Sequence, residues 1–185
     1  TLAGADAGTQ TISGFGSLAL SNNNYTLTGG TGNATIDKVV LTVTADDKTR
    51  TYGSSNPSLT QTITGFVNSE TISVISGTAT ASTTATTSTN AGSSTISASA
   101  GNLSATNYSF TTVDGTLTIN PLAVSLSGSR AYNGNTDIGG SDLVVSNVVG
   151  ADIVTLSGAG TLAGADAGTQ TISGFGSLAL SNNNY

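Results

Sequence analysis

Carboxylates are the main side chains of this chain that could bind a metal or exchange a proton. The 185 residues contain no Cys and no His, which excludes disulfides, thiolate metal sites and histidine catalysis. Carboxylate oxygens are ligands of hard cations such as calcium. The candidates for a calcium site are Asp46, Asp47, Asp137, Asp142 and Asp152. Their spacing lacks the Asp-x-Asp-x-Asp-Gly pattern of a calcium loop, so solvated turn carboxylates are the alternative interpretation, and no cofactor is expected.

Two pairs of basic and aromatic residues share the pattern Arg-x-Tyr followed by Gly. The first pair is Arg50 and Tyr52, and the second is Arg130 and Tyr132. A ligand site is one interpretation of such a pair. Its recurrence favours a structural role, for example a Tyr that packs across a sandwich with its hydroxyl bonded to backbone. We therefore predict that these four residues are structural.

Catalysis and N-glycosylation have weaker sequence support. No nucleophile has a recognisable base and no carboxylate pair has a catalytic setting, so we do not expect an enzyme. Four Asn-x-Ser/Thr sequons would permit N-glycans in a host that makes them, although an Asn- and Thr-rich chain also produces sequons by chance. The sequons are at Asn24, Asn33, Asn102 and Asn107.

Charge and hydrophobicity exclude two classes of partner. The net charge is −6, and only 8% of the residues are charged. Nucleic acids and anionic membrane surfaces need a Lys/Arg-rich face, which four basic residues do not supply. No stretch approaches the roughly 20 apolar residues of a membrane span. We expect neither nucleic-acid binding nor membrane insertion.

The elements that would position these side chains belong to a repeat. Residues 1–25 recur letter for letter as residues 161–185, which gives a period of 160 residues. Such a fixed long period is typical of arrayed domains, so we expect a long repetitive polypeptide. A weaker repeat lies within this period, where Ala91–Ser97 matches Ala167–Ser173 and Asn107-Tyr108 matches Asn184-Tyr185. Two modules of about 80 residues therefore alternate.

Apolar residues alternate with Thr and Ser in several short runs, the period of a strand with one face buried. Gly, Asn and Asp separate the runs at positions suited to turns. We predict an all-β chain of tandem small antiparallel β-sandwich domains, immunoglobulin-like or alternatively β-grasp-like. A β-solenoid would show a shorter rung repeat, which is absent. The predicted strands include Val39–Val43, Thr71–Val74, Thr116–Ile119 and Leu122–Leu126.

The connections between modules are short. Only Asn120 and Pro121 separate the closing strand of one module from the opening strand of the next, and Lys38 alone fills the other connection. Pro121 also has a fixed φ angle. Connectors of this length leave little room for bending, so we predict stiff domains joined head to tail.

These features resemble the MBG (mostly-beta, glycine-rich) and YDG repeat modules of giant filamentous-haemagglutinin-like bacterial surface proteins. Tyr52-Gly53 and the closing Thr116–Ile119 carry the resemblance to MBG, and Tyr132-Asn133-Gly134 carries the resemblance to YDG. The resemblance implies three segments. They are the C-terminal part of a YDG-like module at residues 1–37, a complete MBG-like module at 38–120, and the N-terminal part of the next YDG-like module at 121–185.

The resemblance also implies a secreted bacterial protein at the cell surface or outside the cell. The leading hypothesis is a structural stalk or filament whose partners are the neighbouring modules of the same chain. Lateral self-association of Thr-rich edge strands into fibres is a further expectation, of the kind found in biofilms. One alternative is an adhesin whose modules bind a glycan or another cell-surface ligand. Another is a short subunit that polymerises by donating a strand to its neighbour.

Overall fold

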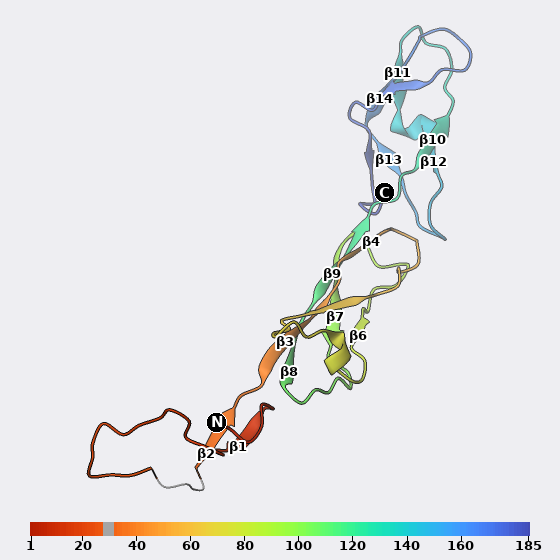
Figure 1. The fold of residues 1–185 in the computed structure, drawn as a ribbon. Helices are drawn as coiled ribbons and strands as arrows, with labels where there is room; N and C mark the ends of the chain where they lie inside the picture. The colour runs from red at the N-terminus through yellow and green to blue at the C-terminus, as the bar shows by residue number, and fades with distance from the viewer. Residues whose placement is uncertain (28–31) are drawn as a thin grey trace. The chain divides into compact units, whose positions relative to one another are not determined.

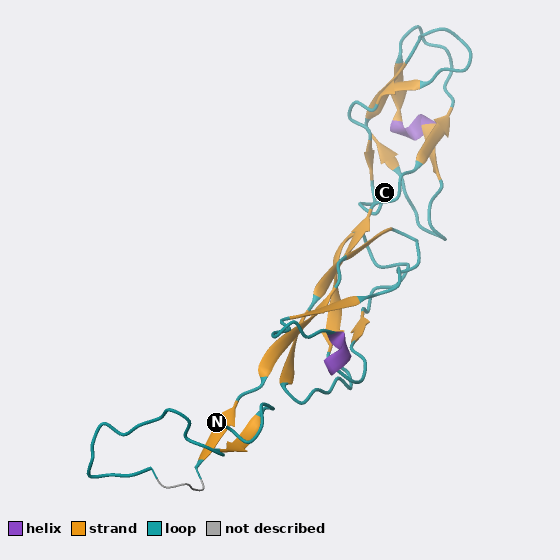
Figure 2. Ribbon diagram, in the orientation of Figure 1, coloured by secondary structure: helices purple, strands orange, loops and turns teal. Residues whose placement is uncertain are grey.

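A computed structural model describes residues 1–27 and 32–185. Residues 28–31, which belong to the closing segment predicted for the first module, lie outside the described residues. The described chain consists of short strands, two 3-10 turns and loops, without an α-helix (Figures 1 and 2). The prediction of an all-β chain is confirmed. The described residues include no helix with the length and apolar character needed to span a bilayer.

The chain forms two compact units. Unit one comprises Thr1–Asp46, Leu59–Ser82 and Ile96–Gly115, and unit two comprises Asp47–Ser58, Thr83–Thr95 and Thr116–Tyr185. Each unit contains residues that precede a short connector together with residues that follow it. The contacts at both connectors therefore lie inside the units.

Unit one is built around β3 (Val39–Ala45), which lies between two partners. It pairs antiparallel with β5 (Gln61–Thr64) and parallel with β8 (Tyr108–Val113), as Figure 1 shows. The alternation of apolar residues and Thr in β3 buries Leu41 and Val43 completely. Unit one also contains two antiparallel pairs. These are β1 (Gly8–Thr11) with β2 (Asn33–Ile36), and β6 (Thr80–Ser82) with the last three residues of β7 (Gly92–Ser99).

Unit two begins with a parallel pair, β4 (Lys48–Thr51) beside β9 (Gly115–Asn120). Strict alternation in β9 buries Leu117 and Ile119, and their side chains form the core of this region. All of the later pairs are antiparallel: β10 (Ser125–Gly128) with β12 (Leu143–Ser146), β14 (Ala159–Leu162) with both β11 (Asp137–Gly139) and β15 (Ile172–Gly174), and β13 (Leu156–Ser157) with β16 (Ala179–Leu180). The 3-10 turn η2 (Gly140–Asp142) connects β11 to β12.

The structure differs from the predicted strands in two places. Thr71–Val74 is not a strand, because Ile72–Val74 forms the 3-10 turn η1, which Thr71 caps. The left-handed backbone of Asn68 and Ser69 turns the chain out of the sheet just before it. The strand predicted at Leu122–Leu126 begins only at Ser125.

The parallel pairs β3–β8 and β4–β9 are a further difference from a wholly antiparallel arrangement. In each pair a strand near the start of the module lies beside one near its end. Alternation along one strand is the same for parallel and antiparallel partners, so the sequence pattern did not distinguish them.

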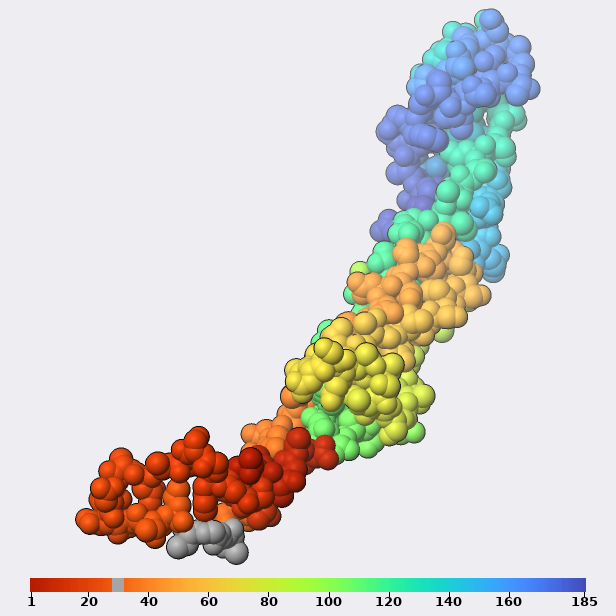
Figure 3. Space-filling model, in the orientation of Figure 1, coloured from red at the N-terminus to blue at the C-terminus, as the bar shows by residue number. Residues whose placement is uncertain are grey.

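The two copies of the 25-residue repeat have different surroundings. Residues 13–27 of unit one form an open loop without a strand, which the space-filling view shows at the red-to-orange end of the chain (Figure 3). In unit two, the same sequence forms β15 and β16. Asn24 is exposed, whereas its counterpart Asn184 is buried. Identical residues thus differ in burial because their neighbours differ.

Candidate functional site

The most developed polar cluster of unit two joins residues on both sides of the connector Asn120-Pro121. The hydroxyls of Tyr52 and Tyr185 both donate to Oδ2 of Asp152, at 2.8 and 2.6 Å. The two rings contact edge to face, with centroids 5.5 Å apart and an interplanar angle of 79°. Tyr52 comes before the connector, while Asp152 and Tyr185 follow it. This trio therefore connects two predicted modules.

Hydrogen bonding tunes the ionisation of the trio. The two phenol donors, Tyr185 first, lower the pKa of Asp152 because they stabilise its charged form. The bond to Asp152 and partial burial raise the pKa of Tyr52, and burial followed by the same carboxylate raises the pKa of Tyr185. At neutral pH the trio is one carboxylate held by two neutral phenols, which favours a structural role over proton transfer.

Gly53 lies directly beside this trio. Its φ of +81° lies in the left-handed region, and a Cβ at this position would be 2.5 Å from Cγ2 of Val149. The backbone N–H of Val149 in turn donates to the hydroxyl of Tyr185 at 2.8 Å. Gly53 thus satisfies a backbone requirement and permits the close approach of the following module.

Asn184 makes a second set of bonds across the same connector. Its Oδ1 accepts from the N–H of Ala91 at 2.7 Å, and its Nδ2 donates to Oδ1 of Asn90 at 3.0 Å. Its backbone carbonyl accepts from the N–H of Leu122 at 2.8 Å. Asn184 is 7% exposed, and these bonds satisfy it in that buried position. We call this arrangement of an Asn on an Ala N–H the clasp.

Unit one contains the same clasp at the other connector. Oδ1 of Asn107 accepts from the N–H of Ala7 at 2.7 Å, and Nδ2 donates to Oδ1 of Asp6 at 3.0 Å. The backbone carbonyl of Asn107 accepts from the N–H of Val39 at 3.0 Å. Each of the three bonds of Asn184 has its counterpart here. The clasp is therefore a repeated feature of both connectors.

The residue that follows each clasp Asn is also used in the same way. The hydroxyl of Tyr108 donates to Oε2 of Glu70 and accepts from the N–H of Val67, just as Tyr185 does with its own Asp and Val. The bond to Glu70 and burial raise the pKa of Tyr108. Phe66 packs edge to face on the same ring, with centroids 5.8 Å apart. Both modules thus place an acid–tyrosine pair beside their clasp.

The two Arg-x-Tyr pairs have different surroundings. Arg50 is buried, and its guanidinium donates to Asn56, to the carbonyl of Thr51 and to the carbonyl of Thr86. Tyr52 is 5% exposed, and its hydroxyl bonds to the Asp152 carboxylate rather than to backbone.

The second pair is more open. The Arg130 guanidinium donates to the carbonyls of Ala131 and Asn135 and to the side chain of Asn133, and its buried Nε has no partner. Tyr132 is 68% exposed and so is not packed as Tyr52 is. Pro121 is exposed within its connector.

The candidate calcium ligands are spread through the chain. Asp46 accepts from the hydroxyl of Thr62, Asp47 accepts from a backbone N–H, and Asp142 accepts from another within η2. Asp137 is an exposed residue of β11. Over residues 1–27 and 32–185, no three carboxylates gather at a point where they would hold a metal ion.

The four sequons differ in accessibility. Asn24, Asn33 and Asn102 are exposed, and the side chain of Asn102 accepts from the N–H of Thr78 at 2.7 Å. Asn107 is half-buried, and its Nδ2, the atom that a glycan would modify, is used in the clasp.

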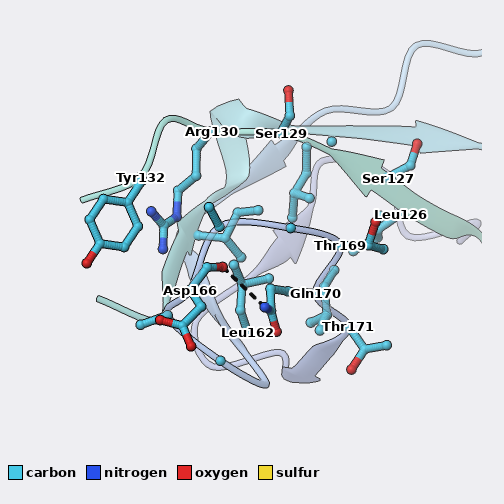
Figure 4. Close-up of a pocket in the computed structure, with 18 of the residues that line it drawn as sticks. Leu126, Ser127, Ser129, Arg130, Tyr132, Leu162, Asp166, Thr169, Gln170 and Thr171 are labelled. Carbon is cyan, nitrogen blue, oxygen red and sulfur yellow. Dashed lines mark hydrogen bonds between the residues drawn. The ribbon is translucent and has the colours of Figure 1, made fainter. Parts of the chain in front are cut away.

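Unit two also has an open groove of about 830 Å³. Figure 4 shows Arg130, Tyr132 and Asp166 near one another at one end of it, with Leu126 and Ser127 at the other. A hydrogen bond of 3.2 Å from Gln170 to the carbonyl of Asp166 shapes the loop between them.

Sequence reasoning did not identify the clasp, although the signal was present. The pairs Asn107-Tyr108 and Asn184-Tyr185 recur, as do Ala91-Gly92 and Ala167-Gly168. Recurrence in diverged modules indicated that these residues matter, but it did not show that the Asn of one module binds the Ala of the module before it. That information needs the three-dimensional arrangement.

Comparison with known proteins places the central part of the chain. No curated protein and no solved structure matches it. Residues 41–118 match the family described as MBG domain (YGX type), and Tyr52-Gly53 lies within the match. MBG domains are typical of bacterial surface repeat proteins. The residues that the match covers include Tyr52, Asn90, Ala91 and Asn107, which form the connector contacts described above. Residues 41–118 are therefore an MBG domain of the YGX type.

Proposed function

We propose that this chain is a structural repeat region of a very large secreted bacterial surface protein, in which alternating modules form an extracellular stalk or filament. The observation that carries the proposal is the recurrence of the clasp at both connectors, on Asn107 and on Asn184. The MBG domain supports the bacterial surface setting.

The contacts at the connectors give the proposed stalk its mechanism. A connector of one or two residues already limits bending, and each clasp adds two side-chain bonds and one backbone bond across it. At Asn120-Pro121 the Asp152–tyrosine trio adds two further bonds. An array joined in this way keeps a fixed spacing from module to module. Length and stiffness, rather than binding chemistry, are then the functional properties.

The proposal includes a YDG-like identity for residues 121–185. Three features support it: Tyr132-Asn133-Gly134 at the start of the segment, Asn184-Tyr185 at the position of Asn107-Tyr108, and the exact 160-residue period. An array of two alternating module types follows, with an MBG domain between two YDG-like modules.

The experiment that tests the function measures the native polypeptide and its location. The polypeptide is extracted from the source bacterium in boiling detergent and sized on an agarose gel, with mass spectrometry of peptides that span Ile119–Val124. Intact cells are labelled in parallel with an antibody raised against residues 38–120. We expect a mass of hundreds of kilodaltons and surface label that protease treatment of whole cells removes. Electron microscopy should then show stalks whose length increases with the number of 160-residue periods.

Two results would overturn the proposal. A native band near 18 kDa would mean separate subunits and would make strand donation the mechanism to test. Label that appears only after cell lysis would remove the extracellular setting. Binding of the 185-residue chain to defined sugars on a glycan array would instead favour the adhesin alternative.

A further inference from the structure

The second copy of the 25-residue repeat contains half of an unused clasp. Asp6-Ala7 binds Asn107 in unit one, and Ala7 is half-buried there. The identical dipeptide Asp166-Ala167 is exposed, and the glycine that follows has nearly the same φ in both copies, +120° at Gly8 and +132° at Gly168. The loop therefore has the backbone shape of a clasp and lies open.

Tyr132 is open at the same end of this module. Its counterpart Tyr52 is 5% exposed and donates to Asp152 of the module that follows it, whereas Tyr132 is 68% exposed. Figure 4 shows Tyr132 and Asp166 together at one end of the groove. In the MBG domain the corresponding residues, Tyr52 and Ala91, are also used together, because the same following module covers both.

The complementary half is present on unit one. Glu70 and Tyr108 form the acid–tyrosine pair that Asp152 and Tyr185 form in unit two. Val67 corresponds to Val149, which packs on Gly53, but Val67 is 40% exposed. Glu70 thus lacks the second tyrosine that Asp152 has among the hydrogen bonds of the described residues.

We propose that Tyr132 and Asp166–Gly168 form a docking surface for a further copy of the MBG module, residues 38–120, that follows Tyr185 in the same polypeptide. In this assignment Asn107 of the added copy clasps Asp166-Ala167, and Tyr132 donates to Glu70 of the added copy. The argument is the identity of residues 1–25 with 161–185, since the first copy shows which module such a segment binds. The inference rests on the proposed function and specifies how a YDG-like module joins the next MBG module.

The docking surface also gives the groove a role. A glycan site would use Tyr132 and Asp166 as ligands from solution, whereas docking covers both with protein. The docked arrangement explains why Arg130 is held by Asn133 and Asn135, since those bonds position the segment that carries Tyr132. Glycan binding at this end of the groove would then be blocked in the array.

The test uses the 185-residue chain and a longer chain in which residues 26–120 are repeated after Tyr185, as they follow Tyr25. Residues 122–185 are isotopically labelled as one segment so that NMR distinguishes them from the identical residues 1–25. We expect the N–H of Ala167 to exchange about tenfold more slowly in the longer chain, because it gains a hydrogen-bond acceptor. Contact of the Tyr132 ring with a soluble paramagnetic probe should fall toward that of Tyr52.

The controls separate docking from a change in folding. Asn107→Ala in the added copy should return the exchange of Ala167 to the rate in the 185-residue chain. Thr106→Ala in the added copy, one residue away and exposed, should leave it slow. The N–H of Ala91, which is clasped in both chains, reports that the labelled segment is folded. Unchanged exchange at Ala167, or slow exchange that Asn107→Ala does not reverse, overturns the inference.

The two proposals fail in different ways. A native polypeptide of hundreds of kilodaltons at the cell surface, together with fast exchange at Ala167 in the longer chain, would leave the stalk in place with a flexible joint after each YDG-like module. A native band near 18 kDa, together with slow exchange in the longer chain, would retain the docking surface and remove the stalk. Sugar binding that persists in the longer chain would assign the groove to a ligand instead.

Discussion

Asn107 and Asn184 have the same role on either side of the MBG domain. Each accepts a 2.7 Å hydrogen bond from an alanine N–H that precedes a connector, Ala7 in one case and Ala91 in the other. The two asparagines follow the connectors in sequence by many residues, so the clasp closes a large loop of chain. A module array with this device needs no disulfide or metal at its joints.

The clasp can be tested with two identical sequence contexts. Asn184→Ala leaves the N–H of Ala91 without its partner in a buried position, and we expect unit two to lose about 1–3 kcal/mol of unfolding free energy. Asn24→Ala changes the same local sequence at an exposed site and should change stability by less than about 0.5 kcal/mol. Urea unfolding followed by NMR measures both variants, and equal losses would argue against the clasp.

Gly53 should tolerate no side chain. Gly53→Ala places a Cβ 2.5 Å from Val149 and strains a backbone with positive φ. Left-handed strain costs roughly 1–2 kcal/mol and overpacking adds about 1–3 kcal/mol. Gly134→Ala is the matched control, because its φ is +78° but the nearest atom to a new Cβ is 3.9 Å away. The difference in unfolding free energy between the two variants measures the contact with Val149, and the absence of a difference would contradict that contact.

The trio around Asp152 should make the second connector sensitive to pH at both extremes. The pKa of Asp152 is lowered in the folded chain, so its stabilising contribution is present above the ordinary aspartate value of about 3.9 and is lost as the pH falls through the lowered value. The pKa values of Tyr52 and Tyr185 are raised, so their contribution is present below about pH 10 and is lost as the pH rises through the raised values.

Thermal unfolding of unit two between pH 2 and 12, read from the Tyr185 and Asn184 signals, tests this pH dependence. We expect a plateau across neutral pH with a fall at each extreme. Asp152→Asn removes the titrating carboxylate, so the difference between the native chain and this variant should vanish at the acid end. An acid-end fall of the same size in both would assign the loss to other carboxylates.

The core of unit two depends on the alternation in β9. Leu117 has no exposed surface, and Leu117→Ala should cost about 2–5 kcal/mol through lost burial and the cavity that remains. Thr118→Ala, the exposed neighbour in the same strand, should cost less than about 1 kcal/mol. Denaturant midpoints of the two variants measure the difference, and similar midpoints would mean that β9 is not a core strand.

Strand positions were predictable wherever one face of a strand is buried. Val39–Val43 and Thr116–Ile119 lie within β3 and β9 because alternation of apolar residues and Thr matches a pleated strand. The same pattern failed at Thr71–Val74, where the left-handed residues Asn68 and Ser69 direct the chain into a 3-10 turn. Local composition does not record that change of direction.

The candidate site was predictable only in part. Arg50 and Tyr52 stood out because their pattern recurs, but Tyr132 has the same pattern and is exposed. The distinction depends on whether a following module covers the tyrosine, which no local pattern encodes. Asp152 was singled out as a calcium candidate, and in the structure its donors are two phenols.

By itself, the sequence determined that this chain is a 160-residue repeat, poor in charge, built of short strands and joined by connectors of one or two residues. These properties depend on composition, period and alternation, which are local or can be read by comparing the chain with itself. Only the tertiary structure decided that β3 and β4 have parallel partners and that Asn107 and Asn184 bind alanines about 100 residues away. Such contacts depend on where the folded chain brings distant segments together, and the spacing of residues along the chain carries no record of it.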